Sequence, residues 1–341
     1  MKPNQFASLA IAAAVSLMLA LAAYTAQTQR STAIPAGTPL FSGITSNADK
    51  IARIEMSQGA RSLTLERSGE QWSIKEKGGF RASTDKVRAM IASLAEAALA
   101  EAKTSNEARH PLLELEDPKG ENANSHLVRL TDSEGKAIAE VIVGKKRFDA
   151  FGTGKAGSYV RRPGEAQTWL VTREIAPSLT LKSWVRERLF ATTPERITRA
   201  KVELTGDTPV EIEREENGKS FRLSKIPDGK KLKYENSVDD IIDTLSSFNI
   251  DDVQRPPQSP PAATATGKAT FGTDKGLELE ITARKESEKT WFSLAAHGEG
   301  EGKAAADDLN DLAAGWEFKI PANQFDRIFR KLGDLLEDKT S

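Results

Sequence analysis

The chain has 341 residues, of which 38% are hydrophobic, and this is enough to form two ordinary cores. Its 48 basic and 49 acidic residues leave a net charge of −1, which argues against a protein that grips nucleic acid through a basic surface. Because the sequence has no cysteine, it excludes disulfides, thiolate metal sites, cysteine nucleophiles and a lipoprotein anchor.

An apolar N-terminal segment is the first predicted element. Residues 6–24 carry no charge, and as a helix these 19 residues reach roughly 28 Å, close to the thickness of the hydrocarbon core of a bilayer. We predict that residues 1–25 contain a transmembrane helix that holds the rest of the chain outside the cytoplasm. The alternative is a cleaved signal peptide, because Ala20-Leu21-Ala22 fits the small-x-small pattern of a cleavage site.

Residues 26–48 have the composition of a flexible linker. They contain Pro35, Gly37, Pro39 and Gly43 among many Ser and Thr residues. A fully extended linker of this length spans about 70 Å. It would let the body search the space above the bilayer.

Residues 49–194 form the first predicted domain, which begins with alternating runs typical of half-buried antiparallel strands. The helix start at 83–85 precedes apolar residues at helical spacing, and the alanines up to residue 102 favour a helix as well. A second helical pattern closes the domain over residues 181–189. The predicted strands cover residues 51–56, 63–66, 72–75, 127–131, 138–143, 159–160 and 169–171.

Residues 195–341 form the second predicted domain and repeat this order. A capping-box pattern at 237–240 precedes a helical stripe that ends at Phe248, and an amphipathic helix over 325–336 ends the chain. A proline-rich loop is predicted at residues 255–267. The predicted strands begin at residue 197 and cover residues 210–212, 221–223, 277–281, 291–294 and 316–320.

Two landmarks indicate that the domains are tandem copies. The pattern that starts at Ile51 returns at Ile197, and Trp169 returns as Trp316, 147 positions later (316 − 169). Strands and helices do not alternate one for one, which argues against a doubly wound parallel sheet. We therefore predict an α+β fold of two tandem copies, each an antiparallel sheet with helices, behind the N-terminal helix.

The motif search identifies no catalytic, cofactor-binding or metal-binding residues. The Gly152–Gly157 segment matches G-x-G-x-x-G, but a strand follows it where a nucleotide site needs a helix, so we predict a flexible hairpin loop. His110, His126 and His297 lack the spacing of metal ligands or of a catalytic motif. The five tryptophans are predicted in cores, with carbohydrate stacking as the alternative.

Acidic clusters at 239–243, 251–252 and 307–311 are predicted to be solvated faces and helix starts. A carboxylate pair for hydrolysis stays open, because such a pair is formed by the fold rather than by the sequence.

Five cations are the predicted partner-binding residues: Lys145, Lys146, Arg147, Arg161 and Arg162. Arg186 and Arg188 belong to the same domain. On a shared face these cations would meet an acidic protein partner or anionic lipid headgroups. The alternative is dispersed surface charge.

Several stretches of residues 51–197 resemble an uncharacterised bacterial family, domain of unknown function 4340. They are Trp72 with the helix at 84–96, Leu113–Pro118, Val141–Lys145, Tyr159–Leu170 and Trp184–Arg188, and the stretch around Pro163 and Gly164 is the most specific. The resemblance implies one N-terminal transmembrane segment and a repeated extracytoplasmic body. It also implies association with ABC-type transport systems that have gliding-motility-like auxiliary subunits, and it supplies no catalytic residues.

We therefore expect a non-catalytic accessory or scaffold protein, tethered to the bacterial inner membrane by residues 6–24 and facing the periplasm. The expected partners are the membrane and the subunits of an ABC-type transporter or gliding-like envelope complex, with no nucleic acid and no small-molecule cofactor. One alternative is an extracytoplasmic protein that binds glycans or lipid headgroups. The other is an envelope hydrolase that uses convergent carboxylates.

Overall fold

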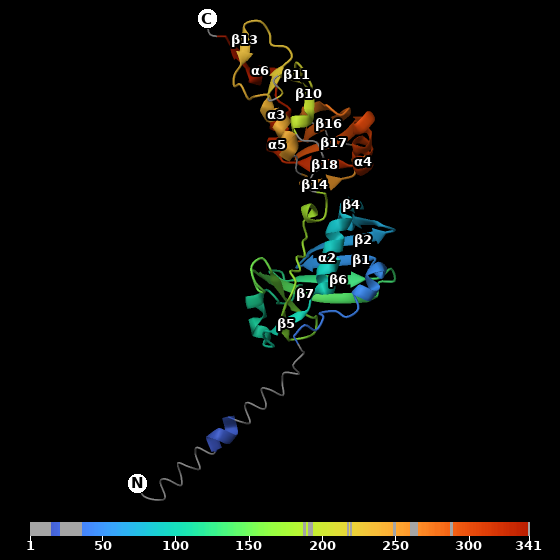
Figure 1. Cartoon of the computed structure of the whole chain (residues 1–341), viewed down its shortest axis with the longest axis vertical. Coiled ribbons are helices and arrows are strands. Elements are labelled where there is room, and N and C mark those ends of the chain that lie inside the picture. The colour runs from blue at the N-terminus through green and yellow to red at the C-terminus, as the bar shows by residue number, and fades with distance from the viewer. Residues whose placement is uncertain are drawn as a thin grey trace, which may run out of the picture. The chain divides into compact units, whose positions relative to one another are not determined.

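The computed structural model describes residues 15–20, 36–186, 189, 194–216, 218, 220–247, 250–259, 265–286 and 289–339. These residues form two large sheets, a two-stranded ribbon and short helices (Figure 1). The strand pairings are antiparallel. The predicted α+β class is therefore confirmed.

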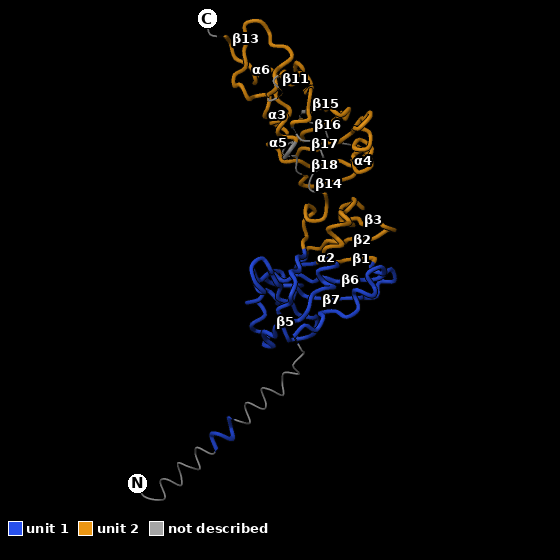
Figure 2. Tube along the Cα trace, in the orientation of Figure 1, with its two compact units in different colours: residues 1–51, 57–60, 90–177 blue, residues 52–56, 61–89, 178–341 orange. Residues whose placement is uncertain are grey.

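The chain folds into two compact units (Figure 2). Unit 1 comprises residues 1–51, 57–60 and 90–177, and unit 2 comprises residues 52–56, 61–89 and 178–341. Unit 2 therefore combines an early stretch of the chain with its C-terminal part.

The first sheet has nine strands in the order β4-β3-β2-β1-β6-β7-β8-β9-β5. Each predicted strand of this region overlaps a strand of the structure and is confirmed. In β1 the alternating side chains of Ile54 and Met56 point to a buried face. The strands are β1 (Arg53–Gln58), β2 (Arg61–Ser68), β3 (Gln71–Ile74), β4 (Phe80–Ala82), β5 (Leu99–Ala102), β6 (His126–Thr131), β7 (Ala137–Arg147), β8 (Gly157–Arg161) and β9 (Thr168–Val171).

The second sheet has eight strands in the order β12-β11-β10-β15-β16-β17-β18-β14. A separate ribbon pairs β13 (Lys230–Leu232) with β19 (Leu336–Asp338). The strands of the sheet are β10 (Ile197–Leu204), β11 (Val210–Arg214), β12 (Phe221–Leu223), β14 (Asp252–Gln254), β15 (Ala265–Thr273), β16 (Leu277–Glu286), β17 (Lys289–Gly298) and β18 (Glu317–Ile320).

Helix α2 (Thr84–Glu96) begins where predicted and buries Val87 and Leu94. The alanines that follow it are not helical, and the prediction that they continue the helix is wrong. Residues 99–102 instead form β5, which pairs with β9. This pairing overrides the helix propensity of alanine.

The predicted helix over 181–189 is also wrong in the part that the structure describes. Residues 181–183 form one 3₁₀ turn. Hydrogen bonds to other segments then replace those of a helix. Ser83 N donates to Trp184 O at 2.6 Å, and the side-chain Nε1 of Trp184 donates to Ser178 O at 2.7 Å. The apolar residues of the pattern are nevertheless buried. Arg188 lies outside the described residues.

Two helices of the C-terminal region differ from their predictions. Helix α3 (Asp239–Asp243) has no side-chain cap at its start, so the predicted capping box is wrong, and Asp239 Oδ1 instead accepts from Phe221 N at 2.9 Å. Phe248 lies outside the described residues. The predicted final helix is two short helices, α5 (Ala322–Ile328) and α6 (Leu332–Leu335), because the backbone leaves the helical conformation at Phe329. Pairing of the next residues with β13 ends α6.

Elements that were not predicted from the sequence are β4, β13, β14, β15, β19 and helix α4 (Lys303–Ala313). Strand β15 begins inside the predicted proline-rich loop, of which residues 260–264 lie outside the described residues. Helix α4 follows a glycine-rich stretch and packs against β16 and β17. Asn310 fastens it there, because its side chain accepts from Ala296 N at 2.8 Å and donates to Ala296 O at 2.7 Å.

The predicted membrane segment lies mostly outside the described residues. Residues 15–20 are helical, and no helix in the described part of the chain combines the length and apolarity needed to cross a bilayer. The end of the predicted linker, residues 36–48, is described and belongs to unit 1. Leu40 and Ile44 of this stretch are buried.

Glu317 of β18 forms a partly buried ion pair across the second sheet. Arg284 donates to its two carboxylate oxygens at 3.0 and 2.7 Å, and Gln254 donates at 3.1 Å. Burial alone would raise the pKa of Glu317. The hydrogen bonds from Arg284 and Gln254 and the charge of Arg284 outweigh burial, so the pKa lies below its usual value.

This ion pair predicts a specific loss of stability in acid. Because the folded-state pKa of Glu317 is lowered, its carboxylate stabilises the fold above the unfolded pKa of about 4.3, and this contribution is lost as the pH falls through the folded value. We expect Glu317→Gln to lower the free energy of unfolding by about 1–3 kcal/mol at pH 7 and by much less at pH 3. Urea unfolding across this range measures both values, and an equal loss at the two pH values would contradict the assignment.

Candidate functional site

The five predicted partner-binding cations lie on or beside the β7–β8 hairpin of unit 1. Lys145–Arg147 end β7, whereas Arg161 ends β8 and Arg162 follows it. Arg161 pairs with Ile142, which is four residues before Lys146 and therefore about 14 Å away along the strand. The structure thus brings three of the cations together and separates the other two from them.

Lys146 and Arg147 are held by partners near the surface. Lys146 Nζ lies 2.7 Å from a Glu174 carboxylate oxygen, and Arg147 Nη1 donates to Tyr159 Oη at 3.2 Å. The ion pair is half-exposed on both sides. Such pairs contribute about 0–1 kcal/mol, so an approaching acidic group can replace Glu174 at little cost.

Two large apolar side chains that were not predicted from the sequence to belong to the site are exposed beside these cations. Leu112 is 69% exposed and Phe148 is 73% exposed. Lys145 Nζ donates to Leu112 O at 3.1 Å, and Lys146 Nζ lies 4.6 Å from the centroid of the Phe148 ring. We call Leu112 and Lys145–Phe148 the hairpin surface. It places two exposed apolar side chains next to positive charge, which suits an interface with apolar contacts at its centre and charged residues at its rim.

Arg161 and Arg162 support the fold of unit 1. Arg161 Nε donates to Leu115 O at 3.1 Å, and Arg162 Nη2 donates to Leu40 O at 2.9 Å. Burial lowers the pKa of Arg161, against the opposite effect of nearby carboxylates, but a guanidinium remains protonated in proteins. These two cations tie loops to the sheet edge and are not part of the hairpin surface.

Gly144 determines how closely strand β7 approaches the 3₁₀ segment at Glu107–Leu113. A Cβ at Gly144 would overlap the carbonyl oxygens of Leu113 and Glu114. This close approach brings the Lys145 side chain within reach of Leu112.

We expect Gly144→Ala to lower the free energy of unfolding by about 1–3 kcal/mol, because the added methyl forces the two segments apart. Denaturant unfolding measures this loss. Gly135→Ala is the comparison, because its φ of +82° strains the backbone while its Cβ meets nothing within 4 Å. A smaller loss for Gly144→Ala than for Gly135→Ala would contradict the role of close packing.

The glycine motif at 152–157 lies in the loop between β7 and β8, as predicted from the sequence, and its last residue, Gly157, begins β8. Its backbone is satisfied within the loop, because Gly154 N donates to Asp149 Oδ1 at 2.6 Å and Lys155 N donates to Gly152 O at 2.9 Å. A strand follows the motif, so no helix N-terminus faces it.

The histidines are dispersed. His110 is buried and its Nε2 donates to Ala166 O at 2.8 Å, which fixes the side chain under the neighbouring loop. His126 lies in β6 and His297 in β17. Within the part of the chain that the structure describes, no three His, Asp or Glu side chains are placed to hold a metal ion.

The tryptophans predicted to be core residues are buried: Trp72, Trp169, Trp184, Trp291 and Trp316. The prediction of core packing is confirmed for them, and none presents the exposed ring face that carbohydrate stacking uses.

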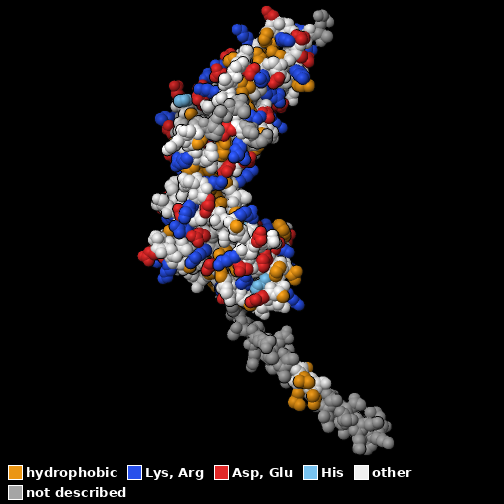
Figure 3. Space-filling model, turned by 180° about the vertical axis from the view of Figure 1, so that it is seen from behind, with side chains coloured by type: hydrophobic (Ala, Val, Ile, Leu, Met, Phe, Trp, Pro, Cys, Tyr) orange, Lys and Arg blue, Asp and Glu red, His pale blue; other side chains and the backbone are white. Residues whose placement is uncertain are grey.

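The acidic clusters face cations or stand at helix starts. In α3 the pKa of Asp243 is raised above its usual value. Partial burial is the largest cause, and the neighbouring carboxylates of Asp239, Asp240 and Glu195 add to it. In α4, Asp308 and Asp311 accept from arginines that belong to other parts of unit 2. Lys and Arg side chains are also interspersed with Asp and Glu over the face seen in Figure 3.

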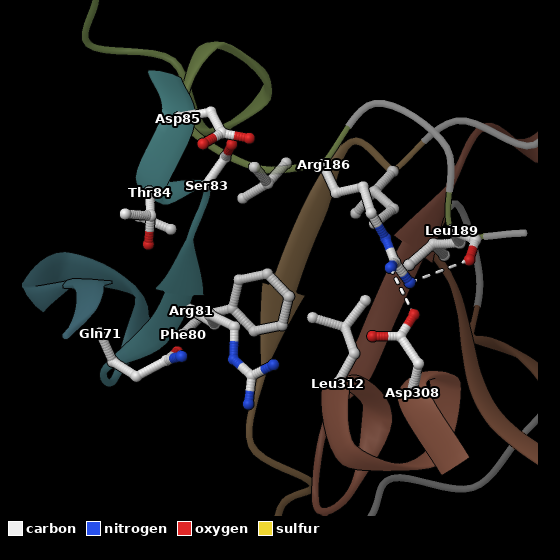
Figure 4. Close-up of a pocket in the computed structure, with 13 residues that line it drawn as sticks. Gln71, Phe80, Arg81, Ser83, Thr84, Asp85, Arg186, Leu189, Asp308 and Leu312 are labelled. Atoms are coloured by element: carbon white, nitrogen blue, oxygen red, sulfur yellow. Dashed lines mark hydrogen bonds and ion pairs between the residues drawn. The ribbon is translucent and has the colours of Figure 1, made fainter. Parts of the chain in front are cut away.

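A cavity of about 290 Å³ lies within unit 2, beside β4 and α4 (Figure 4). Arg186 donates from one wall to Asp308 Oδ2 at 2.6 Å, and Arg81 donates to Asp311 at 2.6 Å. The lining residues include two arginines and two aspartates, Asp85 and Asp308, whose charges cancel. The cavity therefore does not select for a charged ligand. The lining apolar side chains are buried and offer a ligand little surface: Phe80, Ala82, Val185, Leu189, Ile250 and Leu312.

Comparisons with curated proteins and with solved structures found no match. The comparison with family models found one whose description is "Domain of unknown function (DUF4340)", and it matches residues 72–275. The matched stretch begins in β3 and ends after β15, so it contains the hairpin surface and reaches the second sheet. Because more than half of the 341 residues match, the chain belongs to the family of domain of unknown function 4340.

Proposed function

We propose that this protein is a non-catalytic accessory of a membrane complex, tethered by residues 6–24 and facing the periplasm. It docks through the hairpin surface onto a subunit of an ABC-type transport or gliding-like envelope complex. The observation that carries the proposal is the exposure of Leu112 and Phe148 beside Lys145–Arg147. This surface fits a partner with an acidic rim around an apolar pocket.

We also propose that the two sheets are tandem copies of one domain. If β1, β2 and β3 correspond to β10, β11 and β12, and β5 to β14, then β6–β9 correspond to β15–β18. Under this correspondence both sheets have the same strand order, apart from β4 at the edge of the first sheet. The order of eight strands and the return of Ile51 at Ile197 both support duplication.

A lipid-headgroup binder is the second candidate. An exposed aromatic ring with a cation 4.6 Å from its centroid is also typical of side chains at the interface of an anionic membrane. Flotation of the full chain with phosphatidylcholine vesicles, with and without phosphatidylglycerol, separates the two functions. Docking to a protein predicts the same vesicle binding with and without the anionic lipid, whereas headgroup binding predicts stronger binding with it.

The direct test of the accessory function is recovery of the full-length protein from membranes after mild cross-linking and detergent extraction. We expect permease and ATPase subunits of a transport system to be enriched over an unrelated tagged membrane protein. Recovery without any membrane-complex subunit would remove the main support for the proposal.

A further inference from the structure

Residues 36–44, which we call the strap, cover the edge of the first sheet beside β5. Gly37 N donates to Leu99 O at 2.8 Å, Leu99 N donates to Thr38 O at 2.8 Å, and Leu40 N donates to Ala97 O at 2.7 Å. The strap therefore acts as a short additional strand on what would otherwise be an unpaired edge.

Side chains of unit 1 hold the strap in place. Leu40 and Ile44 are 2% and 0% exposed. Arg162 Nη2 donates to Leu40 O at 2.9 Å, which gives a structural role to a cation that the sequence analysis assigned to a partner. Burial of two aliphatic side chains contributes roughly 3–6 kcal/mol, so the strap remains docked in the folded protein.

One row of residues across the sheet connects the strap with the hairpin surface. Leu99 faces Val171, Val171 faces Ser158, and Ser158 faces Lys146. The strap contacts Leu99 at the start of this row. Four strand spacings of about 4.8 Å place Lys146 roughly 19 Å from the strap, at the same level of the sheet.

The docked strap shortens the chain that can separate unit 1 from a bilayer. If the membrane segment ends at Tyr24, 11 residues (35 − 24) precede the strap, and they span at most about 40 Å. Together with the row across the sheet, this length keeps Lys146 within about 60 Å of the bilayer. The linker predicted from the sequence would alone have allowed about 70 Å.

We propose that the strap keeps the hairpin surface close to the membrane, so that its partner is an integral membrane protein with an acidic and apolar face near the bilayer. This inference rests on the proposed tether and docking function. Beyond that function, it locates the binding face of the partner near the bilayer and assigns Arg162 the role of holding the strap in position.

The test places the photo-cross-linker p-benzoylphenylalanine at position 148 of the full-length protein in its native membrane. A Gly/Ser spacer of 40 residues inserted after Arg30 lengthens the stretch between Tyr24 and the strap from 11 to 51 residues. The effective concentration at the partner then falls by about tenfold, since it scales roughly as the −3/2 power of length. We expect the yield of the adduct with a membrane protein to fall by a similar factor.

A matched insertion places the same 40 residues at the Gly135 turn, which follows the strap in the chain. It leaves the distance between the membrane segment and the strap unchanged, so the yield of the protein adduct should be preserved. An unchanged yield after the Arg30 insertion would overturn the inference and leave docking intact. Adducts with lipid alone, or no protein adduct in the parent chain, would overturn both.

A second measurement addresses the strap itself. In Arg162→Ala the amide of Leu99 should exchange with deuterium at least tenfold faster than in the parent protein, while β6 amides in the same sheet keep their protection. Equal protection of Leu99 in both proteins would contradict the positioning role of Arg162, and exchange throughout the sheet would show that unit 1 had unfolded instead.

Discussion

Replacement of Phe80 by alanine is expected to lower the free energy of unfolding by about 3–5 kcal/mol. Phe80 lies in β4 and is 1% exposed. Its ring meets Trp316 and Phe318 edge to face, with centroid distances of 5.0 and 5.9 Å. The substitution removes this burial and both ring contacts, and it enlarges the cavity that Phe80 lines.

Urea unfolding followed by tryptophan fluorescence measures the Phe80→Ala effect, since Trp316 reports on the same contact. Phe148→Ala is the matched control, because Phe148 is exposed and its loss should change stability by no more than about 0.5 kcal/mol. A loss below about 1 kcal/mol for Phe80→Ala would mean that β4 and the C-terminal stretch of unit 2 are not packed together as in the structure.

The second large effect concerns binding. Reversal of Lys145, Lys146 and Arg147 to glutamate should reduce recovery of the membrane partner by roughly tenfold or more, because three attractive charges become repulsive at an acidic face. Phe148→Ala should weaken recovery without changing charge, because it removes an exposed apolar anchor. Quantitative mass spectrometry of cross-linked membranes measures both.

The control for the charge reversal uses surface cations of residues 195–341 that also form ion pairs. Arg199, Arg222 and Lys275 each form an exposed ion pair with a glutamate. Their reversal to glutamate changes the net charge by the same amount and should leave recovery unchanged. Equal losses for the two triple variants would show a general charge effect and would argue against the hairpin surface.

The strands of both sheets were largely predictable, because alternating side chains on one buried face leave a clear period in the sequence. Helices were less predictable where tertiary pairing decided the outcome. Residues 99–102 have alanines that favour a helix, yet they pair with β9 and the strap. Helix α4 was not predicted because it follows a glycine-rich stretch. Its apolar side chains and Asn310 stabilise it through contacts with the neighbouring β17, which the local sequence does not reveal.

The candidate site was predictable in part. The charge of Lys145–Arg147 is visible in the sequence, but the exposure of Leu112 and Phe148 depends on how the 3₁₀ segment and the hairpin meet. The division between surface cations and those that support the fold depends on the same geometry. Arg162, for example, donates to the carbonyl of Leu40, a residue 122 positions away in the chain.

The most direct test of the whole account is the location of the full-length protein after cell fractionation, combined with protease treatment of intact spheroplasts. We predict that it stays in the membrane pellet through carbonate extraction and that external protease degrades its body. Full-length protein that is soluble in the cytosol and protected from external protease would contradict the account.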